Sequence, residues 1–269
     1  MNASRLVRQL LLTLGLALMA SAAWAQAQAT QKPFEPSVGQ AGKDVVWVPT
    51  SQVLVDKMLD LAKVTPQDFV MDLGSGDGRT VITAAKRGAR AMGIEYNPDM
   101  VELSKANAIK AGVAAERATF VKADLFETDF SKATVITMFL LPQINMRLRP
   151  KILAMAPGTR VVSNTFTMED WEADETVTVG GECTTWCTAL FWIVPAKVEG
   201  TWRMPQGELT LKQQFQMLTG TLGTSAISNA RLRGNDIMFT SGGVQYTGRA
   251  NGNSIQGTGG GSWTASKIK

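Results

Sequence analysis

The stretch VMDLGSGDGRT, Val70 to Thr80, decides the fold of this chain. Its first half has the apolar composition of a buried strand, and its second half alternates glycine with small polar residues ahead of a segment with helical spacing. Glycines at positions 74, 76 and 78 allow a sharp bend and a close ligand approach, with the amides of the following helix facing the ligand. The stretch therefore predicts a strand, a ligand-binding loop and a helix.

Short apolar runs alternate with segments of helical spacing around this loop. The predicted strands are DFVMDL, AMGIE, ATFVKAD, ATVITMF and TRVVSN, and the predicted helices include RTVITAAKRG and PDMVELSKANAIKAG. Alternation of this kind is typical of a parallel sheet with helices on both faces. We expect an α/β, Rossmann-like domain over residues 46–196, with Thr50 or Ser51 capping its first helix.

The composition changes after residue 196. Pieces of strand length, such as GELTLKQQFQML and GVQYTGRANGN, are separated there by Gly, Asn and Ser, and no helical period runs through them. Asparagine and glycine tolerate the positive φ angles of tight hairpin turns. We predict a small antiparallel β-meander unit over residues 197–269, in which Trp202 and Trp263 pack the sheet.

The N-terminus has the three parts of a secretory signal peptide. Arg5 and Arg8 supply positive charge, LLLTLGLALMA supplies an apolar core, and Ala23-Trp24-Ala25 supplies a cleavage site. The apolar core is shorter than the ~20 residues of a membrane span. We expect a signal peptide at 1–25, export to the periplasm, no stable membrane span after cleavage, and a flexible leader at 26–45. An uncleaved anchor or a buried helix is the alternative.

The charge balance gives no reason to expect a nucleic-acid partner. The whole chain carries a formal net charge of +4, which falls to +2 once Arg5 and Arg8 are removed with the signal peptide. The remaining chain has no run of Lys and Arg that would follow a phosphate backbone. We therefore expect a protein or a small molecule as the partner.

The two cysteines, Cys183 and Cys187, lie close together in ECTTWC. In an oxidising compartment they would pair if a turn brought their Cα atoms within ~4.4 to 6.8 Å, and they would stay free if they shared one straight strand. The sequence leaves both possibilities open. Because the chain has no histidine and no further cysteine, we expect no metal site.

Acidic residues stand at the ends of three successive predicted strands: Asp72, Glu95 and Asp124. The carboxyl ends of parallel strands meet in the crevice where open α/β sheets bind ligands, and a carboxylate at Glu95 suits a ribose diol. NAD fits less well, because the spacing is G-x-G-x-G and because Asp72 and Asp77 place negative charge where a pyrophosphate would lie. The cationic sulfonium and ammonium of S-adenosylmethionine (SAM) fit better.

Four stretches carry a resemblance to a known family: VPTSQVLVDKML, VMDLGSGDGRTVITAAKRGARAMGIEYNPDMVELSKANA, ADLFETDFSKATVITMFLLPQIN and LAMAPGTRVVSNTF. From Trp47 to Ala196 the chain resembles class I SAM-dependent methyltransferases. More narrowly, it is similar to the small protein-lysine methyltransferases of archaea and to the related mitochondrial enzymes that methylate the ATP synthase c-subunit. This resemblance implies SAM as the cofactor and a lysine amine as the methyl acceptor.

The resemblance also implies roles for individual residues. For the amino-acid portion of SAM it implies contacts with Asp72, Gly74, Ser75 and Gly76. For the ribose it implies Glu95, with Asn97 beside it, and for the adenine it implies Asp124 and Leu125. Beside the methyl group it places Phe139 and Leu140, where many class I enzymes have an Asn/Asp-Pro-Pro-Tyr tetrad. Asn164 stands where a histidine is expected in the lysine-modifying relatives, and we assign it, with Phe139 and Leu140, to positioning the acceptor amine.

Three functions remain open at this point: an exported SAM-dependent methyltransferase, an exported binding module that keeps the fold without catalysis, and an NAD-dependent oxidoreductase. The glycine spacing disfavours the third. Because SAM carries fixed charge, it does not cross a membrane unaided. An exported enzyme must therefore meet SAM outside, cross the membrane folded with SAM bound, or have lost catalysis. The presence of Asp72, the glycine loop, Glu95 and Asp124 together favours the enzyme over the binding module.

Overall fold

The computed structural model describes residues 34–268. The predicted signal peptide, residues 1–25, and the first part of the predicted leader lie outside the described residues. Among the described residues no helix is long and apolar enough to cross a bilayer.

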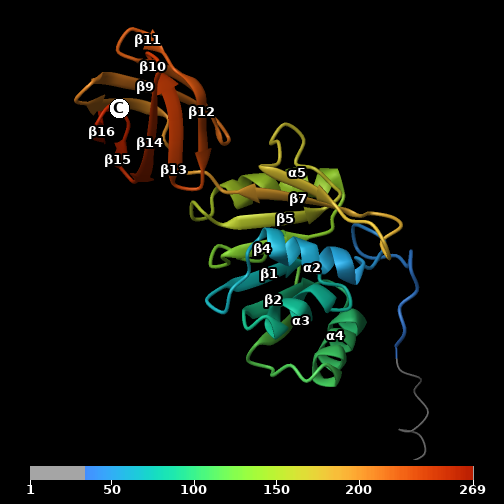
Figure 1. Ribbon diagram of the computed structural model, residues 1–269. Coiled ribbons are helices and arrows are strands. Elements are labelled where there is room, and N and C mark those ends of the chain that lie inside the picture. The colour runs from blue at the N-terminus through green and yellow to red at the C-terminus, as the bar shows by residue number, and fades with distance from the viewer. Residues whose placement is uncertain (1–33, 269) are drawn as a thin grey trace, which may run out of the picture. The chain divides into compact units, whose positions relative to one another are not determined.

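The N-terminal half of the described chain is built on a mixed sheet with the strand order β3-β2-β1-β4-β5-β7-β6 (Figure 1). Strands β1 to β5 run parallel, while β7 is antiparallel to both β5 and β6. The strands are β1 Phe69–Leu73, β2 Arg90–Glu95, β3 Ala118–Lys122, β4 Val135–Met138, β5 Arg160–Asn164, β6 Glu175–Thr178 and β7 Thr188–Ile193. The predicted parallel strands and the α/β class are confirmed.

Helices cover both faces of this sheet. Successive residues of a strand point to opposite faces, so each strand contributes side chains to both layers. The helices are α2 Gln52–Leu61, α3 Arg79–Lys86, α4 Pro98–Lys110 and α5 Pro142–Leu153. Val70 of β1 packs in the core that holds buried residues of α2, α3 and α4, such as Leu54. The next residue, Met71, packs in the other core with Ile144 and Leu148 of α5. The sheet thus carries two apolar layers with the loops exposed at its ends.

A side-chain capping hydrogen bond is present at the start of α4 and absent at the start of α2. Asn97 is the N-cap of α4, and its side chain accepts a hydrogen bond from the Asp99 amide. Ser51 is the N-cap of α2, as its position predicts, but its side chain makes no capping hydrogen bond. The α2 helix is instead held by burial of its apolar face, which includes Leu54 and Met58.

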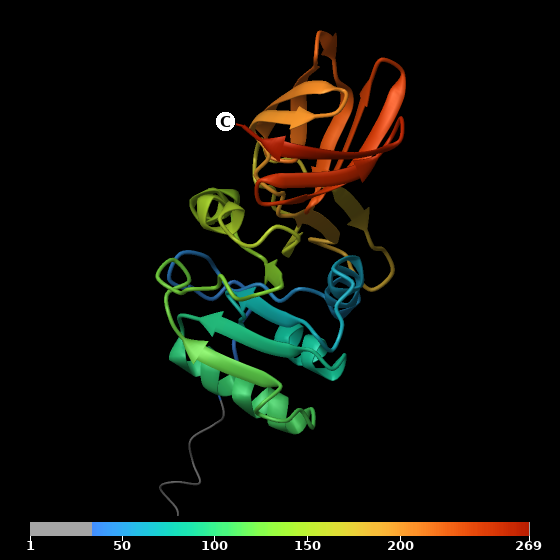
Figure 2. The same ribbon diagram turned by 90° about the vertical axis from the view of Figure 1, so that its left-hand side faces the viewer.

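The C-terminal unit is a closed antiparallel barrel, shown in orange to red in Figure 2. Its strands are β8 Gly200–Met204, β9 Gly207–Gln214, β10 Met217–Leu222, β11 Ser225–Ala226, β12 Ser228–Arg233, β13 Asp236–Ser241, β14 Val244–Asn251, β15 Ser254–Thr258 and β16 Ser262–Lys267. Successive strands pair as predicted for a meander, except that β10 pairs with β12 past the short β11, and pairing of β8 with β16 closes the ring. Closure removes the exposed edges that an open meander would present.

The barrel interior is filled by apolar side chains, as expected for Trp202 and Trp263, which are 0% and 3% exposed. Trp263 lies edge-on to Phe239 and Tyr246. Its ring fits because Gly248 has no side chain: a Cβ there would lie 2.9 Å from the indole. A glycine facing the large ring lets the indole pack directly against the backbone of the strand.

Side chains of the barrel contact the loop between β5 and β6. Phe215, in the β9–β10 turn, stacks on Trp171 with ring centroids 5.9 Å apart. Arg231 of β12 forms an ion pair of 2.8 Å with the buried carboxylate of Asp174, whose other oxygen accepts from the Ile193 amide. Trp171 is fully buried, so its role is packing and not the lining of a substrate channel.

Candidate functional site

A cavity of about 270 Å³ lies at the carboxyl ends of the parallel strands, around the glycine loop. All the predicted cofactor residues line it: Asp72, Gly74, Ser75, Gly76, Glu95, Asn97, Asp124 and Leu125. Phe139 and Leu140 also line it, whereas Asn164 is not among the lining residues. The three strand-end acids Asp72, Glu95 and Asp124 thus meet at one cavity, together with the residues that the family resemblance implied for the cofactor, and Asn164 lies outside its lining.

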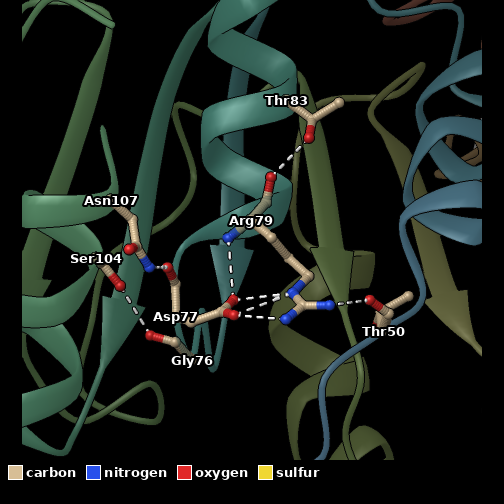
Figure 3. Close-up of polar contacts among 7 residues, drawn as sticks. All are labelled: Thr50, Gly76, Asp77, Arg79, Thr83, Ser104 and Asn107. Atoms are coloured by element: carbon tan, nitrogen blue, oxygen red, sulfur yellow. Dashed lines mark hydrogen bonds and ion pairs between the residues drawn. The ribbon is translucent and has the colours of Figure 1, made fainter. Parts of the chain in front are cut away.

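The glycine loop is fixed by polar contacts from the helices around it (Figure 3). From α4, Ser104 donates to the Gly76 carbonyl at 2.8 Å, and Asn107 donates to the Asp77 carbonyl at 2.9 Å. The Arg79 guanidinium binds the Asp77 carboxylate through two nitrogens and also donates to the Thr50 carbonyl at 2.8 Å. Arg79 pairs with Asp77 and therefore weakens the repulsion of phosphates that the sequence argument assigned to Asp77.

Gly76 is required by backbone geometry and by space. Its φ is +54°, in the left-handed region that favours glycine. A Cβ at this position would lie 2.7 Å from Nε1 of Trp47. Trp47 itself lines the cavity, and the sequence pattern gave it no role because its contact with the loop spans almost thirty residues.

Asp72 is a buried carboxylate at the floor of the cavity. It accepts a 2.6 Å hydrogen bond from the Thr137 hydroxyl. Burial, together with the charges of Glu95 and Asp77, raises the pKa of Asp72 to about 7, even though Thr137 opposes the shift. Within residues 34–268, no basic side chain forms an ion pair with Asp72. Next to it in the loop, the buried hydroxyl of Ser75 lacks any hydrogen-bond partner in this part of the chain.

Glu95 joins the end of β2 to the glycine loop. One carboxylate oxygen accepts from the Gly76 amide and the other from the Asn97 amide, each at 2.9 Å. A carboxylate has about four acceptor positions, so these two bonds leave acceptor capacity for hydroxyl groups of a ligand. Asn97 lines the cavity as well, but its side-chain oxygen is used in capping α4.

Asp124 is held by a segment that precedes the first helix. Lys43 donates to its carboxylate at 2.5 Å, and this bond, together with the Phe126 amide, holds the pKa of Asp124 below its usual value. Lys43 also lies 4.7 Å from the centre of the Tyr96 ring. Neither Lys43 nor Tyr96 was identified from the sequence pattern.

The segment that carries Lys43 belongs to the region predicted as a flexible leader. Residues 37–45 nevertheless make specific backbone contacts: Gly39 donates to the Trp47 carbonyl, and Trp47 donates to the Gln40 carbonyl. Residues 40–50 form one wall of the cavity. The chain ahead of α2 therefore contributes to the site and is not only a connection to it.

Aromatic side chains form another part of the cavity wall. Phe139 follows β4, Phe166 follows β5, and Trp186 lies in the loop between β6 and β7. Cys183 and Cys187 on either side of Trp186 are joined by a disulfide with a Cα separation of 5.8 Å, which settles the pairing that the sequence left open. Phe166 and Trp186 were not predicted as site residues, and the only signal for Trp186 was its place between the two cysteines.

Asn164, predicted to position the acceptor amine, does not line the cavity. Its side chain is fully buried behind the cavity wall, where it donates to the Thr50 hydroxyl at 3.2 Å and accepts from the Thr165 hydroxyl at 2.8 Å. Both the donor and the acceptor of the amide are thus used internally. Thr50 does line the cavity, so Asn164 is connected to the cavity wall through Thr50.

The chemistry of this cavity suits a ligand that carries both positive charge and hydroxyl groups. It offers a buried carboxylate without a basic partner, an unpartnered hydroxyl, a second carboxylate with spare acceptor capacity, and an apolar wall. No group of acidic or sulfur side chains with the geometry of a metal site occurs in the described part of the chain.

Comparisons with known proteins agree with this chemistry. Residues 72–175 match the ANTKMT methyltransferase domain. A protein-lysine N-methyltransferase of Saccharolobus islandicus is 46% identical over 138 residues, which is 50% of this chain and 85% of that protein. The adenine nucleotide translocase lysine N-methyltransferase of mouse is 37% identical over 142 residues, 52% of this chain and 60% of the mouse protein.

A solved structure adds the cofactor. An RNA methyltransferase of Salinibacter ruber in complex with S-adenosylhomocysteine is similar with a TM-score of 0.52 and 46% identity, over 56% of this chain and 96% of that one. The comparisons support neither the NAD-dependent oxidoreductase nor the binding module without catalysis. The chain is a SAM-dependent methyltransferase and belongs to the family of the archaeal protein-lysine N-methyltransferase.

Proposed function

We propose that this enzyme transfers the methyl group of SAM to a lysine amine of a protein. The observation that carries the proposal is the 46% identity to a protein-lysine N-methyltransferase across 85% of that protein. A near-neutral chain without a run of basic residues supports a protein acceptor over a nucleic acid.

The residues around the glycine loop suit the chemical groups of SAM. In our proposal the Asp72 carboxylate accepts from the ammonium of SAM, and the Ser75 hydroxyl gains a partner in its amino-acid portion. Glu95 accepts from the ribose hydroxyls, while Asp124 and Leu125 lie at the adenine. The buried carboxylate with a pKa of about 7 supports this assignment, because a cation beside Asp72 would stabilise its charged form.

SAM, when bound, supplies a methyl group on a positively charged sulfur. Attack by an amine is an in-line displacement, so the main tasks of the protein are to align the amine and to exclude water. Leu140, which is 2% exposed, and Phe139 provide an apolar wall for this purpose. Because the chain has no histidine, we assign no side chain as the base, and the amine loses its proton to water. Asn164 acts indirectly, by orienting Thr50.

The acceptor class is tested by methyl transfer from isotopically labelled SAM. The purified chain is incubated with an unfolded lysine-rich protein, with the same protein after complete lysine acetylation, and with a structured RNA. We expect label in the first protein, none in its acetylated form and none in RNA. Label in RNA, or label that survives acetylation, would contradict a lysine acceptor.

We also propose that the enzyme is exported and works in the periplasm. The signal-peptide pattern at residues 1–25 supports this, and so does the Cys183–Cys187 disulfide, because disulfides persist in oxidising compartments. In this proposal the leader covers 26–45, the methyltransferase domain 46–196 and the β-unit 197–269. Mass spectrometry of the native protein from cell fractions tests the export. An intact Met1 in the cytoplasmic fraction would contradict it.

A further inference from the structure

Three aromatic rings from separate loops meet at one side of the cavity. Phe139 and Phe166 are stacked with their centroids 5.7 Å apart. Trp186 lies 6.2 Å from Phe139 and 5.2 Å from Phe166, tilted to both. All three side chains line the same cavity as Asp72 and Glu95. The rings therefore form one aromatic wall of the site to which SAM is assigned.

Trp186 is held at this wall in an unusual way. It is 41% exposed, so burial alone does not fix its position. Its φ is +59°, a left-handed conformation that is costly for a large side chain. The residue next to it, Cys187, is bridged to Cys183, and the Cys187 carbonyl accepts a hydrogen bond from the Val179 amide. The disulfide closes the loop from which Trp186 projects and limits the conformations open to it.

The aromatic wall has a chemical preference. Aromatic faces attract cations, and the attraction is strongest for tryptophan. A lysine acceptor arrives as an ammonium and leaves with one or more methyl groups that spread its charge and weaken its hydration. An apolar aromatic wall favours such a cation over a neutral group of the same shape.

We propose that the Cys183–Cys187 disulfide positions Trp186, together with Phe139 and Phe166, as a binding site for the ammonium of the methyl acceptor and for its methylated forms. The identification of the cation as a lysine ammonium rests on the proposed function, whereas the preference of the aromatic wall for a cation does not. Trp186 binds the acceptor in this proposal, and the disulfide acts through Trp186 as a positioning element.

The test compares two ligands of equal shape by titration calorimetry on the S-adenosylhomocysteine-bound protein. One is N-acetyl-trimethyllysine amide, and the other is its neutral analogue with a tert-butyl group in place of the trimethylammonium. A cation–aromatic contact of ~1 kcal/mol corresponds to about fivefold in affinity. We expect the wild-type protein to prefer the charged ligand at least about fivefold.

The variants test the contribution of the Trp186 ring separately from that of the disulfide-closed loop that positions it. Trp186→Ala and the double variant Cys183→Ser/Cys187→Ser should lose the preference for the charged ligand, while Trp186→Phe should keep part of it. Thr184→Ala is the matched control, because it changes an exposed residue of the same loop and keeps both the disulfide and the tryptophan. Affinity for S-adenosylhomocysteine should stay at the wild-type value in Thr184→Ala, and the two ligands are compared in every variant at saturating S-adenosylhomocysteine.

Equal affinity of the wild-type protein for the two ligands would overturn the proposal, and so would a full preference retained by Trp186→Ala. A full preference in the double cysteine variant would overturn the role of the disulfide. Failure of the proposed function would be distinguishable from failure of this site. A protein that prefers the charged ligand through Trp186 but methylates no lysine would support this site and would refute lysine as the acceptor.

Discussion

Replacing Asp72 by asparagine should stabilise the free enzyme and weaken its binding of SAM. Burial and two neighbouring carboxylates raise the pKa of Asp72 from 3.8 to about 7. The folded chain therefore holds a proton that the unfolded chain has lost between these two pH values, and the free energy of unfolding falls as the pH rises through this window. A shift of about three pKa units corresponds to a cost on the order of 4 kcal/mol at pH 8.

Asparagine removes this cost and keeps the hydrogen bond from Thr137, because its side-chain oxygen still accepts from the Thr137 hydroxyl. Denaturant unfolding at about pH 8 without ligand should show Asp72→Asn to be more stable than wild type by several kcal/mol. The difference should shrink to about 1–2 kcal/mol near pH 5, where most of the native carboxylate is protonated. Equal stability of the two proteins at pH 8 would refute the reasoning from burial.

The effect on SAM binding has the opposite sign. A charge-assisted hydrogen bond contributes ~1.5–3 kcal/mol, so Asp72→Asn should bind SAM at least about tenfold more weakly at pH 8. In the wild type, affinity should fall by up to about tenfold per pH unit below 7, since the ammonium needs the ionised carboxylate. The variant should lack this pH dependence. Wild-type affinity in the variant would show that Asp72 does not bind the cofactor.

Two further substitutions test the loop and the barrel contact. Gly76→Ala places a Cβ 2.7 Å from the Trp47 indole at a φ of +54°. The affinity for SAM, measured by calorimetry, should therefore fall at least about tenfold. Unchanged affinity would contradict the close packing of the loop against Trp47. Arg231→Met leaves the buried Asp174 carboxylate without its cation and should lower the free energy of unfolding by about 3 kcal/mol. Arg249→Met removes the exposed ion pair with Asp236 and should change the free energy of unfolding by less than about 1 kcal/mol. Equal losses in the two arginine variants would contradict the assignment of Asp174 as a buried partner.

The local pattern of the sequence was sufficient to predict the parallel sheet and the acidic residues at the cofactor side of the site. Strand and helix periods are properties of neighbouring residues, and the topology of parallel sheets brings strand ends to one edge. The sequence therefore predicts that Asp72, Glu95 and Asp124 lie together, and all three line the cavity. The unit after residue 196 was predicted as antiparallel for the same reason, since its turns are local.

Contacts between distant residues could not be predicted in this way. The barrel closes through pairing of Trp202 with Lys267, which no local pattern specifies. Lys43 reaches the cavity from the segment predicted as a flexible leader, and Trp47 reaches it from the residues directly after that segment. Asn164 has the right place in the chain for an acceptor residue, but its side chain turns into the interior because both of its polar atoms find partners there.

The most direct test of the account is a calorimetric titration of SAM into the wild-type protein and Glu95→Gln. The substitution keeps the shape of the side chain and removes the charge that we assign to the ribose hydroxyls. Glu102→Gln, on the exposed surface of α4, is the control. We predict one SAM bound per chain in the wild type and the control, and at least about tenfold weaker binding in Glu95→Gln. Absence of binding to the folded wild type at millimolar SAM, or equal affinity in all three proteins, would contradict the account.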